Sequence, residues 1–287
     1  MRVTRRGLVR AGSVAAALAA GGTFAAGQFV GADRDDAASA LVAGSLLRVA
    51  TRVPGASVEA HGSAAARRLV TEGLREPDAV ALADPGLFDG VSERATLFAT
   101  NALVVAYDPA SPHAGRLERD WRGALAADDV RVGRTDPARD PLGYRTVMAL
   151  ELAERHGWVD AGSVLDRSAV LPETDLMNAL EGGAVDAAFA YRSMAVERGL
   201  PAVALPARID FSDPDRAGTY ASASYELDHA TVRGAPIRYA AAATTPRGES
   251  WVNRLVAARE LLESSGFGVP ADYPRYDVPV GTAEDNA

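Results

Sequence analysis

Short apolar runs alternate with longer stretches of helical periodicity over most of the chain. The apolar runs predict buried strands, among them 41–43, 56–60, 77–84 and 185–191. The periodic stretches predict helices, among them 64–73, 144–155, 173–181 and 251–264. Strands and helices that alternate in this way indicate an α/β fold.

Two of the predicted strand-to-helix turns have the same arrangement. The first strand is followed by Gly44 and Ser45, and the second by Gly62 and Ser63. In an open parallel sheet both turns lie at the carboxyl ends of strands, where α/β folds bind ligands. Ser45 taken alone predicts a helix cap. The recurrence of the turn favours a ligand site.

A third turn, 133–145, connects a predicted strand at 129–132 to the helix that follows. Pro141 suits the first helical position, where its missing N–H has no consequence. The free backbone N–H groups of Leu142 and its neighbours would then point out of the helix start and form a site suited to an anion. On its own this segment predicts an ordinary capped turn.

Extended apolar segments at 97–107 and 191–205 are long enough to pass between two parts of a fold, and Asn101 interrupts the first of them. We therefore expect two lobes. The first lobe would comprise 36–102 together with 206–287, and the second would comprise 103–205.

The N-terminal residues 1–32 predict a twin-arginine export signal. Arg5 and Arg6 precede an uncharged, Ala- and Gly-rich run that ends at Ala32. A cleaved signal is favoured over a retained anchor, because the run is far less apolar than a typical membrane span. The chain contains no cysteine, which excludes a lipid-anchor cysteine, a disulfide and a thiolate metal site. We expect an exported protein, in the periplasm, at the cell surface or outside the cell.

The charge of the chain is negative. The formal net charge is −8, and residues 1–32 carry four arginines and no acid, so the exported part is near −12. This charge argues against nucleic acid and anionic membranes as partners. Every basic residue is arginine, and the absence of lysine together with an acid excess fits a high-GC or salt-adapted source.

Taken in order, the motifs resemble the periplasmic-type solute-binding proteins for molybdate and tungstate, in particular the archaeal branch. The resemblance covers about 42 to 268, and the Asp-Pro-Leu-Gly-Tyr-Arg piece is its most specific part. The motifs that carry it are Ala43-Gly44-Ser45-Leu46, Gly62-Ser63, Ala83-Asp84, Asn101-Ala102-Leu103-Val104, Asp140-Pro141-Leu142-Gly143-Tyr144-Arg145 and Phe189-Ala190-Tyr191-Arg192-Ser193. The resemblance implies a two-lobed type II fold with a ligand cleft between the lobes.

The resemblance also implies a set of ligand-binding residues. Ser45 and Ser63 match the two serines that contact the oxyanion from the first lobe. The backbone N–H of Leu142 matches a donor of the second lobe, and Tyr191 matches a tyrosine that faces the cleft. Asp140 matches an acidic residue that coordinates the metal centre of the bound oxyanion. No cofactor and no free metal ion are expected.

Asp140 distinguishes between two modes of binding, coordination of the metal and contact with the oxygens of the ion, because molybdate and tungstate are dianions. A carboxylate beside their oxygens would repel them by several kcal/mol in a partly dry site. The contact is favourable only if the carboxylate binds the metal or carries a proton. The archaeal branch uses a second carboxylate for six-fold coordination, expected near 189–191, where this chain has Ala190. Six-fold and tetrahedral binding therefore both stay open.

The leading hypothesis is a monomeric solute-binding subunit that captures an oxyanion and hands it to the membrane permease of an ABC importer. A diverged solute-binding protein for another anion or small solute is the first alternative. An exported serine hydrolase is the second. It is disfavoured, because neither Gly-Ser turn has the Gly-x-Ser-x-Gly pattern of a nucleophile elbow and the four histidines are scattered.

Overall fold

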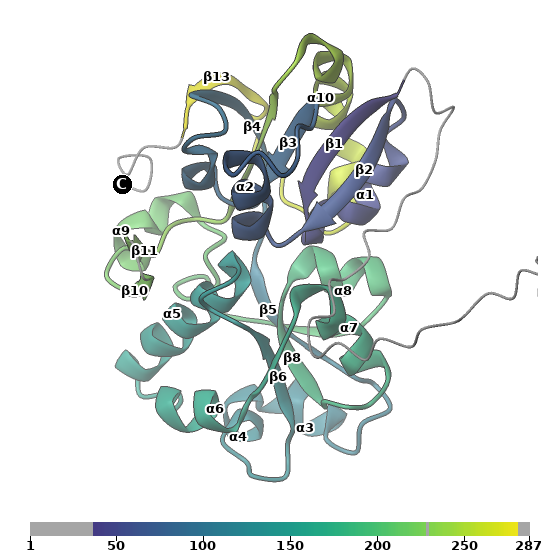
Figure 1. Ribbon diagram of the computed structural model, residues 1–287. Helices are drawn as coiled ribbons and strands as arrows, with labels where there is room; N and C mark the ends of the chain where they lie inside the picture. The colour runs from purple at the N-terminus through teal and green to yellow at the C-terminus, as the bar shows by residue number, and fades with distance from the viewer. Residues whose placement is uncertain (1–36, 228–229, 281–287) are drawn as a thin grey trace, which may run out of the picture.

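The computed structural model describes residues 37–227 and 230–280. The export signal predicted over 1–32 lies outside these residues. Figure 1 shows two halves, each built around its own sheet, that the chain joins near the centre. We call the half with the six-stranded sheet the first lobe and the half with the five-stranded sheet the second lobe. No helix in the described ranges is both long and apolar enough to cross a bilayer.

The first lobe has the strand order β13-β4-β12-β3-β1-β2. Strands β1, β2 and β3 are parallel, whereas β12 and β13 pair antiparallel with their neighbours. The strands are β1 (Ala38–Ala43), β2 (Ala56–His61), β3 (Ala79–Leu82), β4 (Arg94–Thr100), β12 (Arg238–Ala243) and β13 (Arg275–Pro279). The helices are η1 (Gly44–Leu46), α1 (Leu47–Arg52), α2 (Ser63–Thr71), η2 (Pro85–Phe88), η4 (Pro246–Gly248), α10 (Glu249–Ala257) and α11 (Arg259–Ser264).

The second lobe has the strand order β7-β6-β8-β5-β9. Strands β6, β7 and β8 are parallel, and β5 is antiparallel to β8 and β9. The strands are β5 (Leu103–Tyr107), β6 (Val132–Thr135), β7 (Ala169–Leu171), β8 (Ala187–Tyr191) and β9 (Ala202–Ala204). The helices are α3 (Ala114–Arg119), α4 (Trp121–Leu125), α5 (Pro141–Arg155), α6 (Ala161–Arg167), α7 (Glu173–Glu181) and α8 (Arg192–Arg198).

Parallel pairing places the important turns of each lobe at one edge of its sheet. In the first lobe Ala43 pairs with His61, so η1 and α2 both begin at the carboxyl edge. The predicted repeat of strand, Gly-Ser and helix is therefore confirmed. In the second lobe α5, α7 and α8 follow β6, β7 and β8 in the same way. Each lobe thus gathers its helix starts at one edge, the usual place for ligand contacts in α/β folds.

The chain passes from the first lobe to the second within the segment 97–107. Strand β4 belongs to the first sheet and β5 to the second, and only Asn101 and Ala102 separate them. The chain returns between β9 and β12 through η3 (Pro214–Arg216), α9 (Ala217–Tyr220) and a hairpin of β10 (Ser224–Leu227) and β11 (Ala230–Arg233). The hairpin lies beside α5 (Figure 1). The lobe boundaries at 102 and 205 remain a prediction.

Helix α5 connects the sequence to the site most directly. Asp140 caps it, since its Oδ1 accepts the N–H of Gly143 at 2.9 Å, and Pro141 is the first helical residue as predicted. Leu142, Met148 and Leu152 are buried on its apolar side. The helix start is therefore fixed both by its cap and by packing.

Two predicted elements differ from the structure. The helix expected over 251–264 is two helices, α10 and α11, with a break at Ala258. The periodicity missed the break, because Leu255 and Leu262 are buried on either side of it. The segment 191–205, predicted to be extended and to pass between the lobes, instead contains α8 and β9 and stays in the second lobe.

Candidate functional site

The five predicted ligand-binding residues lie at the two carboxyl edges and are all buried. Ser45 lies in η1 and Ser63 is the first residue of α2, with exposures of 2% and 1%. On the second lobe Asp140 and Leu142 lie at the start of α5, and Tyr191 ends β8.

Two glycines mark where the lobes meet. A β-carbon added at Gly62 would lie 3.5 Å from Cβ of Asp140 on the opposite lobe. A β-carbon at Gly44 would lie 3.3 Å from Oε2 of Glu173. The Gly-Ser turns of the first lobe therefore approach the starts of α5 and α7 closely, and glycine leaves room for two carboxylates there.

Two of the predicted hydroxyl groups accept a hydrogen bond from the protein and keep their own hydrogen. Ser63 Oγ accepts the backbone N–H of Ala83 at 3.0 Å. Tyr191 OH accepts Nη1 of Arg145 at 2.9 Å. Each hydroxyl then has one hydrogen left to donate. Such groups suit a ligand whose surface consists of acceptor oxygens.

Asp140 has one carboxylate oxygen fully engaged. Its Oδ1 accepts the hydroxyl of Thr135 at 2.8 Å as well as the N–H of Gly143. Burial raises the pKa of Asp140 to about 6, although these two bonds and the N–H of Leu142 act in the opposite direction. The predicted N–H donor of Leu142 therefore lies beside this carboxylate.

We expect the raised pKa of Asp140 to appear as pH-dependent stability. Between the ordinary aspartate pKa of about 4 and the folded value of about 6, the folded state binds more protons than the unfolded state. The free energy of unfolding should therefore fall as the pH rises through this window. Asp140→Asn, which keeps the cap, should remove that contribution.

Urea unfolding of the wild type and of Asp140→Asn at pH 4, 5, 6 and 7 measures this effect. The stability advantage of the wild type over the variant should shrink as the pH rises. An advantage that is constant or grows with pH would contradict a raised pKa at Asp140.

Glu173 is a candidate site residue that the sequence did not predict. The second carboxylate was sought near 189–191, but Ala190 is fully buried within β8. The structure instead brings Glu173, the first residue of α7, next to Asp140. Burial raises the pKa of Glu173 well above its usual range, and the Asp140 carboxylate raises it further. Burial raises the pKa values of Tyr191 and Tyr239, and the Glu173 carboxylate raises them further, so this carboxylate lies among the candidate site residues.

A sequence signal for Glu173 existed. The residue follows β7 directly after Pro172, so it occupies the same topological position in its strand-to-helix unit as Asp140 does in its own. Within the described residues no cation or hydrogen-bond donor is paired with its carboxylate. Glu173 is thus an acidic group beside the two Gly-Ser turns, without a partner of its own in that part of the chain.

Arg145 joins the two lobes in the buried region behind the site. Its Nη2 lies 3.1 Å from Oδ2 of Asp84, and its Nη1 donates to the carbonyl oxygen of Ala83 at 3.1 Å as well as to Tyr191. The hydroxyl of Tyr144 donates to the same Asp84 oxygen at 2.9 Å. Ser63 and Tyr191 are therefore connected through Ala83 and one arginine.

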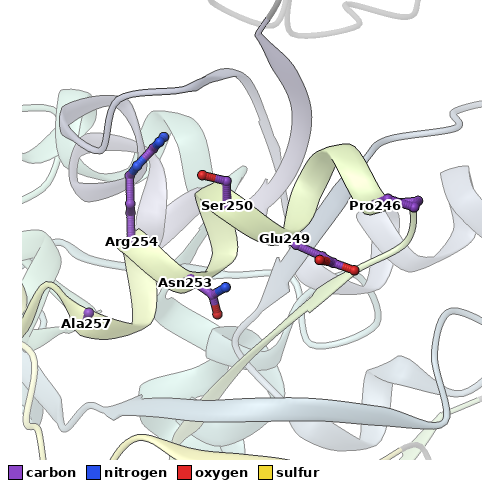
Figure 2. Close-up of a pocket in the computed structure, with 6 residues that line it drawn as sticks. All are labelled: Pro246, Glu249, Ser250, Asn253, Arg254 and Ala257. Atoms are coloured by element: carbon purple, nitrogen blue, oxygen red, sulfur yellow. The ribbon is translucent and has the colours of Figure 1, made fainter.

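A separate open hollow lies along the outer side of α10 (Figure 2). It contains none of the predicted ligand residues. Its lining consists of Pro246, Glu249, Ser250, Asn253, Arg254 and Ala257. Over residues 37–227 and 230–280 there is no cluster of three or more His, Cys, Asp or Glu residues that could hold a metal ion.

Comparison with known sequences supports the predicted family. The chain is 49% identical to a Haloferax volcanii protein named as an ABC transporter molybdenum-binding protein, over 91% of this chain and 92% of that protein. It is 32% identical to the molybdate/tungstate-binding protein WtpA of Thermococcus kodakarensis, over 63% of this chain and 61% of that protein.

Solved structures share the fold at low sequence identity. The periplasmic molybdate-binding protein of Azotobacter vinelandii superposes with a TM-score of 0.56 at 14% identity, over 81% of this chain and 99% of that one. The sulfate-binding protein SubI of Mycobacterium tuberculosis gives 0.55 at 14% identity, over 83% and 88%. These neighbours confirm the predicted type II solute-binding fold. A family model described as bacterial extracellular solute-binding protein matches residues 53–268. The chain therefore belongs to the bacterial extracellular solute-binding protein family.

Proposed function

We propose that this protein captures molybdate or tungstate between its two lobes and delivers the ion to the permease of an ABC importer. The ligands would be the hydroxyls of Ser45, Ser63 and Tyr191, the N–H of Leu142, and the carboxylates of Asp140 and Glu173. The names of the Haloferax and Thermococcus relatives support the ligand class.

One observation carries the proposal, which is the combination of hydroxyl groups and two carboxylates at one point. Ser63 and Tyr191 keep hydrogens to donate, which suits the oxygens of an anion. When ionised, Asp140 and Glu173 would repel any anion that met them only through its oxygens. Molybdenum and tungsten can add carboxylate oxygens to their four oxo ligands, whereas the central atoms of sulfate and phosphate cannot. Two carboxylates therefore favour a metal oxyanion.

Neutral variants of the two carboxylates test whether these groups bind the metal, because loss of a metal ligand weakens tungstate binding whereas loss of a repelling charge strengthens it. If they coordinate the metal, Asp140→Asn and Glu173→Gln should each weaken tungstate binding at least about tenfold, a loss of about 1.4 kcal/mol or more. Asp175→Asn is the matched control, because Asp175 lies with Glu173 in the first turn of α7 and is exposed. It should change the affinity less than about twofold.

Calorimetric titration with tungstate measures these affinities. Unchanged or tighter binding by both neutral variants would show that the carboxylates do not bind the metal. X-ray absorption at the tungsten edge gives an independent answer, since the proposed site has six oxygen neighbours and a purely hydrogen-bonded oxyanion has four.

The proposed activity is binding without turnover. Among the described residues neither serine of the site is hydrogen bonded to a histidine, because Ser45 pairs with Tyr239 and Ser63 with Ala83. A serine nucleophile would need such a base. Hydrolysis of an ester panel that disappears in Ser45→Ala or Ser63→Ala would instead support the hydrolase alternative.

The proposed place of action is outside the cytoplasmic membrane. The extracellular solute-binding family supports it, and so does the paired-arginine sequence before residue 32. We further propose that the protein acts as a monomer whose two lobes close on the ligand by a hinge motion.

A further inference from the structure

We propose that Asn101 is a positioning residue that fixes the Ser45 hydroxyl as a hydrogen-bond donor toward the ligand. The inference rests on the proposed function, because it takes Ser45 as a ligand-binding residue. It adds a role for two buried residues, Asn101 and Tyr239, that do not themselves belong to the proposed ligand set.

Backbone groups determine the orientation of the Asn101 amide. Asn101 lies at the crossing between β4 and β5 and is 1% exposed. Its Oδ1 accepts the N–H of Ala102 at 3.0 Å and the N–H of Ser193 at 3.4 Å. Because both partners can only donate, the oxygen must face them and Nδ2 must face the other side.

The two hydrogens of Nδ2 are both used. One is donated to Ser193 Oγ at 2.8 Å and the other to Tyr239 OH at 3.2 Å. Ser193 lies in the first turn of α8 in the second lobe, and Tyr239 lies on β12 of the first. Asn101 therefore bonds to both lobes at the point where the chain passes between them.

Tyr239 transmits this orientation to Ser45. Its ring is fully buried and packs edge-on against Phe267, with 5.2 Å between the ring centroids. Its hydroxyl lies 3.0 Å from Ser45 Oγ, a distance that allows either atom to donate. The Tyr239 oxygen already accepts from Asn101, and within the described residues Ser45 is the partner left to accept its hydrogen. A buried hydroxyl hydrogen without an acceptor is unfavourable, so Tyr239 donates to Ser45.

Ser45 is then in the same state as Ser63 and Tyr191. Each hydroxyl oxygen accepts one bond from the protein, and each hydrogen is free for the ligand. Reversal of the chain of hydrogen bonds would turn the Ser45 hydrogen toward Tyr239 and present a lone pair to the oxyanion. Asn101 thus determines, through Tyr239, that Ser45 donates its hydrogen bond to the oxyanion.

A double-mutant cycle tests this role in the full chain. Asn101→Asp keeps the shape of the side chain but replaces the donor with an acceptor, so at pH 8 Tyr239 should donate to the new carboxylate and accept from Ser45. Tyr239→Phe removes the connection and leaves Ser45 free to donate. The four proteins are the wild type, both single variants and the double variant, each titrated with tungstate and each tested for its thermal midpoint.

Asn101→Asp alone should weaken tungstate binding by about ten- to a hundredfold, since one hydrogen bond to a charged ligand is reversed. Tyr239→Phe alone should change the affinity by less than about threefold. In the Tyr239→Phe background Asn101→Asp should have an effect of less than about threefold as well. The large coupling between the two substitutions is the signature of the relay.

Equal losses from Asn101→Asp in both backgrounds would overturn the inference, because repulsion by the new charge or a distorted hinge does not depend on the Tyr239 hydroxyl. If Asn101→Asp does not fold, the tungstate affinity of Tyr239→Phe is compared with that of Ser45→Ala. The relay predicts a much smaller loss for Tyr239→Phe, and equal losses would contradict it. A wild type that binds no oxyanion would refute the proposed function itself, and the inference with it.

Discussion

Arg145→Met is expected to lower the free energy of unfolding by about 3–5 kcal/mol, because it leaves a buried carboxylate without its cation. The Arg145 and Asp84 side chains are only 3% and 10% exposed, and Nη2 of Arg145 lies 3.1 Å from Oδ2 of Asp84. Methionine retains much of the length of the arginine side chain, so the loss reports the missing charge and donors more than a cavity. The arginine also holds Ala83 and Tyr191, so oxyanion affinity should fall with stability.

Urea unfolding at pH 7 measures the loss. Arg139→Met is the matched control, since Arg139 precedes the same helix but its side chain is 84% exposed and pairs only with Asp136 among the described residues. It should change stability by less than about 1 kcal/mol. If the loss arises from the unpaired charge, Asp84→Asn should lower the free energy of unfolding less in the Arg145→Met background than in the wild type. Losses of equal size at Arg145 and Arg139 would refute it.

Ser45→Ala combined with Ser63→Ala is expected to reduce tungstate affinity by about a hundred- to ten-thousandfold. Each serine supplies one hydrogen bond to a charged ligand, and such bonds contribute about 1.5–3 kcal/mol each. The two residues lie on adjacent turns of the first lobe and share one ligand, so the single variants must be titrated beside the double variant to measure their coupling. The Ser63 substitution also removes the acceptor for the Ala83 N–H, which makes stability a necessary second measurement.

Calorimetric titration and the thermal midpoint of the double variant provide the result. The exposed pair Ser222→Ala and Ser264→Ala is the control and should bind like the wild type. An affinity within about threefold of the wild type in the site variant would remove Ser45 and Ser63 from the ligand set. A loss that matches a collapse of the fold would be seen in the thermal midpoint.

The sequence was informative wherever the site depends on local order. The two Gly-Ser turns, the start of α5 at Pro141 and the crossing at Asn101 all follow from short-range patterns, and the parallel sheets then bring their turns together. The Asp140 cap was also within reach, since an aspartate before a proline commonly begins a helix.

The sequence was uninformative where a contact joins distant segments. Glu173 is next to Gly44 and Gly62 only because the second lobe folds against the first, so no spacing along the chain predicts the contact. The contact between Tyr239 and Ser45 spans 194 positions. The search for a second carboxylate at 189–191 found none because that stretch has no acidic residue, whereas Glu173 lies at the helix start after β7.

Titration of the purified protein with tungstate, molybdate, sulfate and phosphate at high salt distinguishes a metal oxyanion site from a general anion site. Tungstate and molybdate should bind tightly and sulfate and phosphate weakly or undetectably, because only the first two can accept the carboxylates of Asp140 and Glu173. Equal affinity for sulfate, or no heat with any of the four anions, would contradict the proposed metal oxyanion site.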